Sequence, residues 1–158
     1  QNVIIDLLTA GDLFGGLPIL GEETYDEAVE AHSAGCVLGI GADEFREVLD
    51  SHPTVATHVL EFVSTRLRDA HDQIRLLSAS AVPERLAAIL LRLARKLTAS
   101  GDGERLPLSQ QDLADMTGST IETVNRTLKR FREQGAVETG RGWVAVKDTG
   151  LLEALVQE

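Results

Sequence analysis

Residues 108–146 read "LSQQDLADMTGSTIETVNRTLKRFREQGAVETGRGWVAV", and this stretch carries the signals that decide the fold. Ser109 is followed three residues later by Asp112. This spacing is typical of a helix start, because the serine oxygen can accept a hydrogen bond from a backbone N–H group of the first turn. The helix that begins there is expected to end at Thr117-Gly118, where a glycine follows the last apolar residues.

A second helix is expected directly after this turn. Ser119 or Thr120 supplies its N-cap, the helix runs through Arg132, and Gly135 ends it as the residue just past the last turn. Two short helices joined by a tight glycine-containing turn form a helix-turn-helix. The periodicity of the second helix places three apolar side chains on its inward face: Val124, Leu128 and Phe131.

The residues after the second helix predict a β-hairpin. "AVETGRGWVAV" reads as two short strands around Gly140-Arg141-Gly142, and a hairpin in this position is the wing of a winged helix. The alternative is a three-helix core with a hairpin and no nucleic-acid role. The composition of the second helix disfavours that alternative, since its outward and flanking positions are Ile121, Glu122, Asn125, Arg126 and Lys129.

These outward side chains match the chemistry of DNA recognition. Arginine can bind guanine O6 and N7 with two hydrogen bonds, and glutamate can accept one from cytosine N4. Glu122 and Arg126 lie four residues apart on one helical face, so they are placed to read neighbouring base pairs in a major groove. The alternative is an ion pair on a solvated helix, worth only ~0.3–0.5 kcal/mol. The candidates for phosphate contacts are Ser109, Thr120, Thr123, Lys129 and Arg141.

The longest periodic element runs from Pro53 to Leu77. Its apolar residues recur at alternating steps of four and three, which is a heptad seam on a helix ~36 Å long. A core-packed helix is the alternative. So narrow a stripe on so long a helix favours a partner helix, most simply a second copy across a two-fold axis. The heptad seam runs from Ala56 to Leu77. The residues expected at the homodimer interface are Leu60, Val63, Leu67, Ala70, Ile74 and Leu77.

The rest of the chain predicts strands first and helices later. Residues 1–42 read as about four strand-like pieces separated by glycines. Because so few strands leave an edge and a face of a sheet unburied, we expect a missing N-terminal portion. "ADEFREVLDSHP" predicts a short helix that ends at Pro53, and "SASAVPERLAAILLRLARKL" predicts an amphipathic helix with Pro83 in its first turn. The domain boundary is placed near residues 77–81.

The net charge of the 158-residue chain is −10, but the acidity is uneven. Residues 1–60 hold eleven Asp or Glu against one arginine, a net of −10, whereas residues 119–147 hold six Lys or Arg against three Glu, a net of +3. Exposed charges beyond a Debye length of ~8–10 Å are screened, so a polyanion responds mainly to the nearby field. The acidic total therefore does not exclude DNA binding by the basic stretch.

Several classes of protein are disfavoured. No apolar run approaches the ~20 residues that span a bilayer, and no basic-then-apolar signal segment is found. Cys36 is the single cysteine, which fits a reducing cytoplasm, so we expect a cytoplasmic protein with no membrane partner. The four histidines show no metal-ligand spacing, and no nucleophile–base–acid set with a supporting motif occurs. Neither a metal site nor an enzyme is expected.

Taken in order, "GDLFGG", "VEAHSAGCVLGI", the heptad helix, "VPERLAAILLRL" and "LSQQDLADMTGSTIETVNRTLKRFREQGAVE" resemble the bacterial cyclic-AMP receptor protein/FNR (Crp/Fnr) family of transcription regulators. The resemblance covers essentially the whole chain, and "IETVNRTLKRF" is similar to the family's E-T-x-x-R recognition helix. It implies a β-roll sensor domain completed by further N-terminal residues, and a homodimer formed along the long helix. It also implies a palindromic operator whose half-sites lie one helical turn apart, ~34 Å.

The resemblance also implies roles for single residues. Glu122 and Arg126 match the family's base-reading Glu and Arg, which engage a TGA-type core. The position before the Glu is Arg in the cyclic-AMP receptor and Ile121 here. Since isoleucine can touch a thymine methyl but cannot clamp a guanine, we expect an FNR-like half-site with TGA rather than TGTGA. Asn125 occupies a position that varies in the family and is expected to tune specificity.

Gly11-Asp12 lies where the family's cyclic-nucleotide cassette begins. Nucleotide-binding members have Gly-Glu there and, farther along, an Arg-Ser pair that holds the cyclic phosphate. That pair falls on Tyr25-Asp26, inside an acidic cluster that repels phosphate. We therefore expect a degenerate effector cassette without control by cyclic AMP; the alternative is a real pocket whose missing arginine comes from elsewhere. An FNR-type iron–sulfur cluster needs several cysteines, which Cys36 alone does not supply, although the expected missing N-terminal residues could supply them. No cofactor is therefore identified.

The sequence thus predicts an α+β protein in three parts. These are the C-terminal part of a cyclic-nucleotide-binding-like β-roll (residues 1–52), a long dimerisation helix with a hinge (53–80) and a winged helix-turn-helix domain (81–158). The expected partners are double-stranded DNA and a second copy of the chain, and the expected function is sequence-specific regulation of transcription. A different class stays open, in which the acidic first third binds a protein such as RNA polymerase and DNA binding is incidental.

Overall fold

The structure is a computed structural model that describes residues 4–15, 28–32, 34–100 and 105–156. The chain falls into two compact units. Residues 13–72 form one, called the first unit here, and residues 1–12 together with 73–158 form the other, called the winged-helix unit. The chain therefore passes between the units twice, once after Asp12 and once within a long helix. The three functional parts that the sequence predicts, with boundaries at 52 and 80, stay a prediction.

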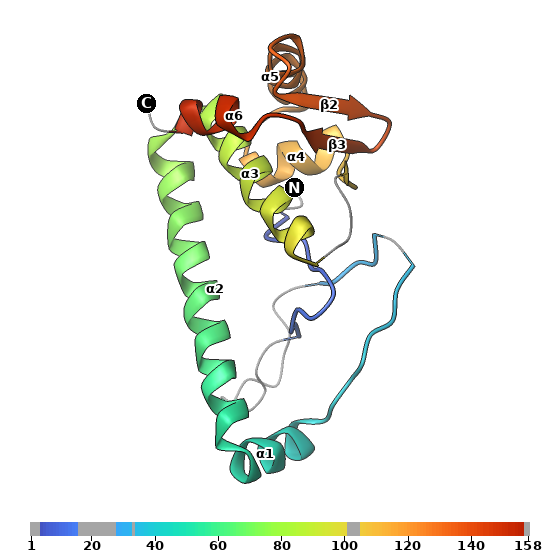
Figure 1. Ribbon diagram of the computed structural model, residues 1–158, viewed down its shortest axis with the longest axis vertical. Helices are drawn as coiled ribbons and strands as arrows, with labels where there is room; N and C mark the ends of the chain where they lie inside the picture. The colour runs from blue at the N-terminus through green and yellow to red at the C-terminus, as the bar shows by residue number, and fades with distance from the viewer. Residues whose placement is uncertain (1–3, 16–27, 33, 101–104, 157–158) are drawn as a thin grey trace. The chain divides into compact units, whose positions relative to one another are not determined.

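The first unit contains α1 (Ala42–Ser51) and most of α2 (Pro53–Ala79) (Figure 1). Both confirm helices that the sequence predicts, and α2 begins at its proline because a proline fits the first turn of a helix. The Arg66 guanidinium lies 5.3 Å from the centroid of the Phe62 ring, one turn away on α2. Arg66 also donates a hydrogen bond of 3.5 Å to the carbonyl oxygen of Leu13.

The strands expected in residues 1–42 do not form in residues 4–15, 28–32 or 34–41. Val37 and Leu38, in one of the expected strands, are 71% and 99% exposed. A strand exists only when a neighbouring strand takes up its hydrogen bonds, and apolar composition alone does not supply that neighbour. The predicted α+β class with a C-terminal helix-turn-helix is confirmed.

The winged-helix unit contains the end of α2 and all the elements that follow it (Figure 1). These are α3 (Val82–Ser100), β1 (Arg105–Leu106), α4 (Gln110–Thr117), α5 (Ile121–Glu133), β2 (Val137–Gly140), β3 (Trp143–Val146) and α6 (Thr149–Val156). Three of the helices, α3 to α5, and the β2–β3 hairpin confirm the sequence predictions. The sequence patterns do not predict β1 and α6.

The sheet of this unit has the strand order β1-β3-β2, with both pairs antiparallel. Gly140 pairs with Trp143 at the closed end of the hairpin, and Arg105 pairs with Ala145. Leu106 and Val144 form the next pair and are both buried. Because side chains alternate across a strand, the sheet has an inner face toward the helices and an outer face that carries Arg105 and Trp143.

The core of the unit is built around α3, which contacts α4, α5, α6, β1 and β3. Leu86, Leu90, Leu93 and Leu97 recur at steps of three or four along α3 and are all buried. Phe131 of α5 is fully buried in the same cluster. Burying one such side chain stabilises a fold by roughly 1.5–3 kcal/mol, so this cluster fixes where α4 and α5 lie on α3.

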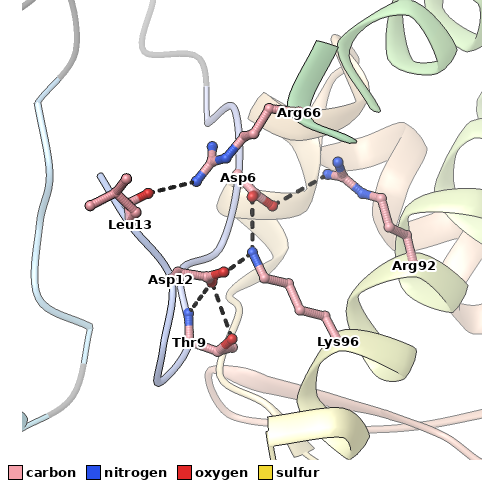
Figure 2. A network of polar contacts seen from close by, with 7 residues as sticks. All are labelled: Asp6, Thr9, Asp12, Leu13, Arg66, Arg92 and Lys96. Carbon is pink, nitrogen blue, oxygen red and sulfur yellow. Dashed lines mark hydrogen bonds and ion pairs between the residues drawn. The ribbon is translucent and has the colours of Figure 1, made fainter. Parts of the chain in front are cut away.

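Residues 4–12 also pack on α3, as Figure 2 shows. Ile4 and Leu7 pack against the apolar core. Lys96 Nζ lies 3.0 Å from Asp6 Oδ2 and 2.9 Å from Asp12 Oδ2. The Lys96 ammonium group therefore pairs with two carboxylates, those of Asp6 and Asp12, which are distant from it in the sequence.

Candidate nucleic-acid interface

Helix α4 begins as the sequence predicts. The Ser109 hydroxyl accepts a hydrogen bond of 3.2 Å from the backbone N–H of Asp112, and the Asp112 carboxylate accepts one of 2.7 Å from the backbone N–H of Ser109. This reciprocal capping box satisfies two N–H groups that a helix start leaves unpaired. The helix ends at Gly118, whose φ of +59° is a left-handed conformation that favours glycine.

Helix α5 follows after a short turn and is the candidate recognition helix. Thr120 is its N-cap, and its hydroxyl accepts a hydrogen bond of 3.3 Å from the backbone N–H of Thr123. Gly135 lies just past the helix end with φ +79°, as expected for a residue in that position. The residues on the buried face of α5 are Val124, Thr127, Leu128 and Phe131. They include the three residues that the sequence predicts to face inward.

The predicted base-reading residues occupy the other faces of α5. Glu122, Asn125 and Arg126 are exposed, and Ile121 is half-buried because it packs against the core. Among the described residues neither Glu122 nor Arg126 makes a hydrogen bond or an ion pair, so the i,i+4 pair that the spacing allows is not formed. Both side chains therefore keep their hydrogen-bonding groups available for a partner. Ile121 presents only part of its side chain.

The predicted phosphate-contacting residues lie in α4, α5 and the wing. The hydroxyls of Ser109 and Thr120 already accept from the backbone as N-caps, and the Ser109 hydroxyl keeps its O–H group as a donor. The Thr123 hydroxyl lies 3.1 Å from that of Thr120, at the start of α5. Lys129 Nζ lies 3.9 Å from Glu133 Oε1, an exposed and weak pair. Arg141 is exposed in the β2–β3 turn.

The wing contains one interaction that the sequence patterns do not predict. The guanidinium carbon of Arg105 lies 4.3 Å from the centroid of the Trp143 ring. Arginine over a tryptophan face is the strongest common form of the cation–π interaction. Trp143 is the single tryptophan of the chain and follows Gly-Arg-Gly directly, which was a signal for the wing tip. Nothing local pointed to Arg105, because β1 is only two residues long.

The predicted effector cassette is described only in part. Gly11 has φ +90°, and the Asp12 carboxylate binds Lys96 and accepts two hydrogen bonds from Thr9. Burial raises the pKa of Asp12, but the Thr9 hydrogen bonds and Lys96 lower it more, so it lies below its ordinary value of 3.8. Tyr25 and Asp26 lie outside the described residues. The Asp12 carboxylate is thus occupied by contacts within the chain.

The predicted dimer seam runs along α2. Leu60, Leu67 and Ile74 are 67%, 57% and 61% exposed, and Ala70 is also exposed. Leu77 at the end of the seam is exposed as well, whereas Val63 is half-buried. A row of exposed leucine and isoleucine side chains at heptad spacing is the pattern that a partner helix covers.

Other kinds of site would need metal-ligating clusters, cysteine pairs or membrane-spanning helices among the described residues. No group of three or more His, Cys, Asp or Glu side chains there is arranged to hold a metal ion. Cys36 is exposed. None of the described helices is long and apolar enough to cross a membrane.

Comparisons with known proteins agree with this geometry. The Crp-like helix-turn-helix domain family matches residues 84–155. The cyclic AMP receptor protein of Thermus thermophilus is 30% identical over 98% of this chain and 70% of its own length. The nitrogen fixation regulation protein FixK of Bradyrhizobium diazoefficiens is 30% identical over 98% of this chain and 65% of its own.

Solved structures of transcription regulators are also similar to this chain. FixK2 from Bradyrhizobium japonicum superposes with a TM-score of 0.63 at 27% identity, over 73% of this chain and 59% of that one. A transcriptional regulator of the crp/fnr family from Eubacterium rectale superposes with a TM-score of 0.51 at 25% identity. The superposition covers 74% of this chain and 52% of that one. The chain thus spans a little over half the length of these solved proteins and about two thirds of the two relatives.

Proposed function

This chain belongs to the Crp/Fnr family of helix-turn-helix transcription regulators, and from that premise we propose that it binds a palindromic operator as a homodimer. Helix α5 enters the major groove of each half-site, and the β2–β3 wing lies along the neighbouring backbone. The protein works where the bacterial chromosome is, in the cytoplasm.

One observation carries the base-reading part of the proposal. Glu122 and Arg126 are exposed on the first half of α5, four residues apart, and neither is bound to another described side chain. In this arrangement Arg126 binds a guanine through O6 and N7, and Glu122 accepts from a cytosine N4. Ile121 is half-buried and offers no hydrogen bond, which favours TGA half-sites over TGTGA. Asn125 lies beside Arg126 and adjusts the preference for flanking base pairs.

Phosphate contacts fix the position of α5 without specifying sequence. Thr120 and Thr123 lie at the N-terminus of α5, where unpaired N–H groups and the helix dipole also favour an anion. Ser109 at the start of α4, Lys129 on α5 and Arg141 on the wing supply further donors. Helix α5 itself carries four Lys or Arg against two Glu, so its local charge is positive although the chain is acidic.

The homodimer forms along α2. The exposed seam of Leu60, Leu67 and Ile74 supports this arrangement, because three large apolar side chains on one stripe of a helix are costly to leave in water. A parallel pair of α2 helices repeats α5 across a two-fold axis. We expect the two half-sites to lie one helical turn apart, ~34 Å.

Control by cyclic AMP is not part of the proposal. In nucleotide-binding members of the family an acid at the position of Asp12 binds the ribose, whereas Asp12 here binds Lys96 and Thr9. The second candidate function is a regulator that does require a cyclic nucleotide, and the name of the Thermus thermophilus relative favours it. Titration of the DNA complex with cyclic AMP separates the two, because only the second candidate predicts a gain in operator affinity.

The proposal is tested with variants of α5 and a set of duplexes. Arg126→Ala is expected to lose ~1–3 kcal/mol at the guanine of each TGA half-site and to tolerate substitution of that base pair. Lys129→Ala is expected to weaken binding to all duplexes alike. Arg95→Ala is the control, because Arg95 is an exposed arginine on α3 that pairs with Glu153 at 2.7 Å. An Arg126→Ala variant with unchanged base preference contradicts the proposal.

A further inference from the structure

The turn at the tip of the wing is not of the type that two-residue hairpin loops favour. Arg141 and Gly142 join β2 to β3, and Gly140 pairs with Trp143 across the turn. Two-residue hairpin loops favour turns with positive φ at the first central residue or at both, since other turns splay the strands. Here φ is +74° at Gly142, and no described residue other than glycine has positive φ, so Arg141 does not. The turn alone therefore favours a closed tip less than the usual hairpin turns do, and contacts outside the turn add to its closure.

The first such contact joins Trp143 to Gly140. A Cβ atom placed on Gly140 would lie 2.2 Å from the indole atoms Cε2 and Nε1 of Trp143. The ring therefore lies directly over the glycine backbone, across the pair that closes the hairpin. The φ of Gly140 is not positive, so a glycine is needed here for space and not for its backbone conformation. An aromatic side chain over a cross-strand glycine is a device that fixes strand register.

The second contact joins the same ring to the third strand. Arg105 of β1 lies opposite Ala145 of β3, and Ala145 and Trp143 point to the same face because they are two residues apart. The Arg105 guanidinium carbon is 4.3 Å from the centroid of the Trp143 ring. The ring thus belongs to β3, covers β2 and is contacted from β1. It ties the three strands together next to the turn.

We propose that Gly140, Trp143 and Arg105 form a stack that positions the wing, so that Arg141, which lies between the first two, meets a DNA phosphate. The proposal rests on the proposed function, because it takes the wing to contact DNA. Arg105 and Trp143 are positioning residues, and Arg141 makes the contact. A turn that is already held loses less conformational freedom on binding than a mobile one, so the stack strengthens the Arg141 contact without touching the base-reading residues.

Gly140→Ala tests the stack most directly, because its Cβ displaces the ring. Four proteins are compared: the wild type, Gly140→Ala, Arg141→Ala and the double variant. Each is titrated with a TGA palindrome and with a scrambled duplex at several salt concentrations. The emission of Trp143, the single tryptophan, reports whether the ring has moved. Gly150→Ala is the matched control, since it makes the same chemical change in α6, away from the wing.

Gly140→Ala is expected to shift the tryptophan emission to the red. It should also lower the slope of log K against log salt by about 0.9 per wing, which corresponds to one lost phosphate contact. In the wild-type background, Arg141→Ala should lower the salt slope by the same amount as Gly140→Ala does. In the Gly140→Ala background, Arg141→Ala should lower the salt slope no further. Equal losses from Arg141→Ala in both backgrounds would overturn the proposal. Unchanged emission in Gly140→Ala would overturn the placement of the ring.

Arg105→Lys keeps the positive charge but removes the planar group that stacks on the indole. Arg105→Lys serves as the second variant if the Gly140→Ala protein is unfolded under the conditions of the titrations. It is expected to shift the emission and lower the salt slope in the same direction, and a wild-type slope would exclude Arg105 from the stack. If the wild type itself binds the palindrome no better than the scrambled duplex, the proposed function fails. The salt slopes on either duplex still decide the role of the stack.

Discussion

The Asp12 carboxylate lies 2.9 Å from Lys96 Nζ and thereby holds the segment around Asp12 on helix α3. The same carboxylate oxygen accepts hydrogen bonds from the backbone N–H and the hydroxyl of Thr9, at 2.7 and 3.1 Å. Together these contacts lower the pKa of Asp12 below 3.8 against the effect of burial, which raises it. A carboxyl whose pKa is lowered by folding stabilises the fold above its unfolded pKa, and this contribution is lost as the pH falls through the folded value.

Asp12→Asn is therefore expected to lower the free energy of unfolding near pH 7. The difference from the wild type should shrink as the pH falls below 3.8 and through the lowered pKa of Asp12 in the folded protein, below which the wild-type carboxyl is also neutral. Urea titrations at neutral and acid pH measure both effects. Asp69→Asn removes one negative charge from an exposed position on α2 and is the control. A difference between wild type and Asp12→Asn that is constant with pH would show that Asp12 acts through packing and not through its charge.

Ser109→Ala removes the acceptor for the Asp112 N–H at the start of α4. Loss of such an N-cap is expected to cost about 1 kcal/mol, which lowers the melting temperature of the winged-helix unit. Thermal melts followed by circular dichroism measure the change. Ser119→Ala is the matched control, because Ser119 precedes the N-cap Thr120 and caps neither helix. Equal melting temperatures for the two variants would show that the capping box does not stabilise the protein.

Gly118 is the C-cap of α4 in a left-handed conformation, with φ +59°. Gly118→Ala is expected to destabilise the protein by about 1–2 kcal/mol, because L-residues other than Asn and Asp are strained there. The cost comes from the backbone, since a Cβ at this position lies an ordinary 3.6 Å from Leu77 Cδ2. Gly118→Asn should be milder in urea unfolding. A larger loss for Asn than for Ala would point to a steric cause instead.

Leu67 lies in the middle of the α2 seam and is 57% exposed. Leu67→Glu places two carboxylates near the two-fold axis of the proposed dimer, so we expect it to be a monomer in sedimentation equilibrium. Thr65→Glu adds the same charge to an exposed position on the opposite side of the helix and should leave the dimer intact. A dimeric Leu67→Glu protein would place the interface elsewhere.

The winged helix was predictable from the sequence because its signals are local. Ser109 and Asp112 cap a helix within one turn, Gly118 and Gly135 stop helices in conformations that favour glycine, and Phe131 lies in phase with the other buried residues of α5. Each signal lies within one helix or at its end. The exposed positions of Glu122 and Arg126 follow from the same periodicity.

The features that the sequence did not predict depend on contacts between residues that are far apart in the sequence. Arg105 forms a strand only because β3 pairs with it, and its ring contact with Trp143 follows from that pairing. Lys96 binds Asp12 across most of the chain. Helix α6 is short and packs on α3, so its own pattern gave a weak signal. The apolar residues near Val37 looked like a strand, but among the described residues no neighbour pairs with them.

The central claim is that the basic winged helix of this acidic chain reads DNA sequence. Fluorescence anisotropy of the wild-type protein tests it, with a palindrome of TGA half-sites and a scrambled duplex of the same composition at about 150 mM salt. We predict that the palindrome binds at least ~10³-fold more tightly, as is usual for specific over non-specific sites. Equal affinity for the two duplexes would contradict the account.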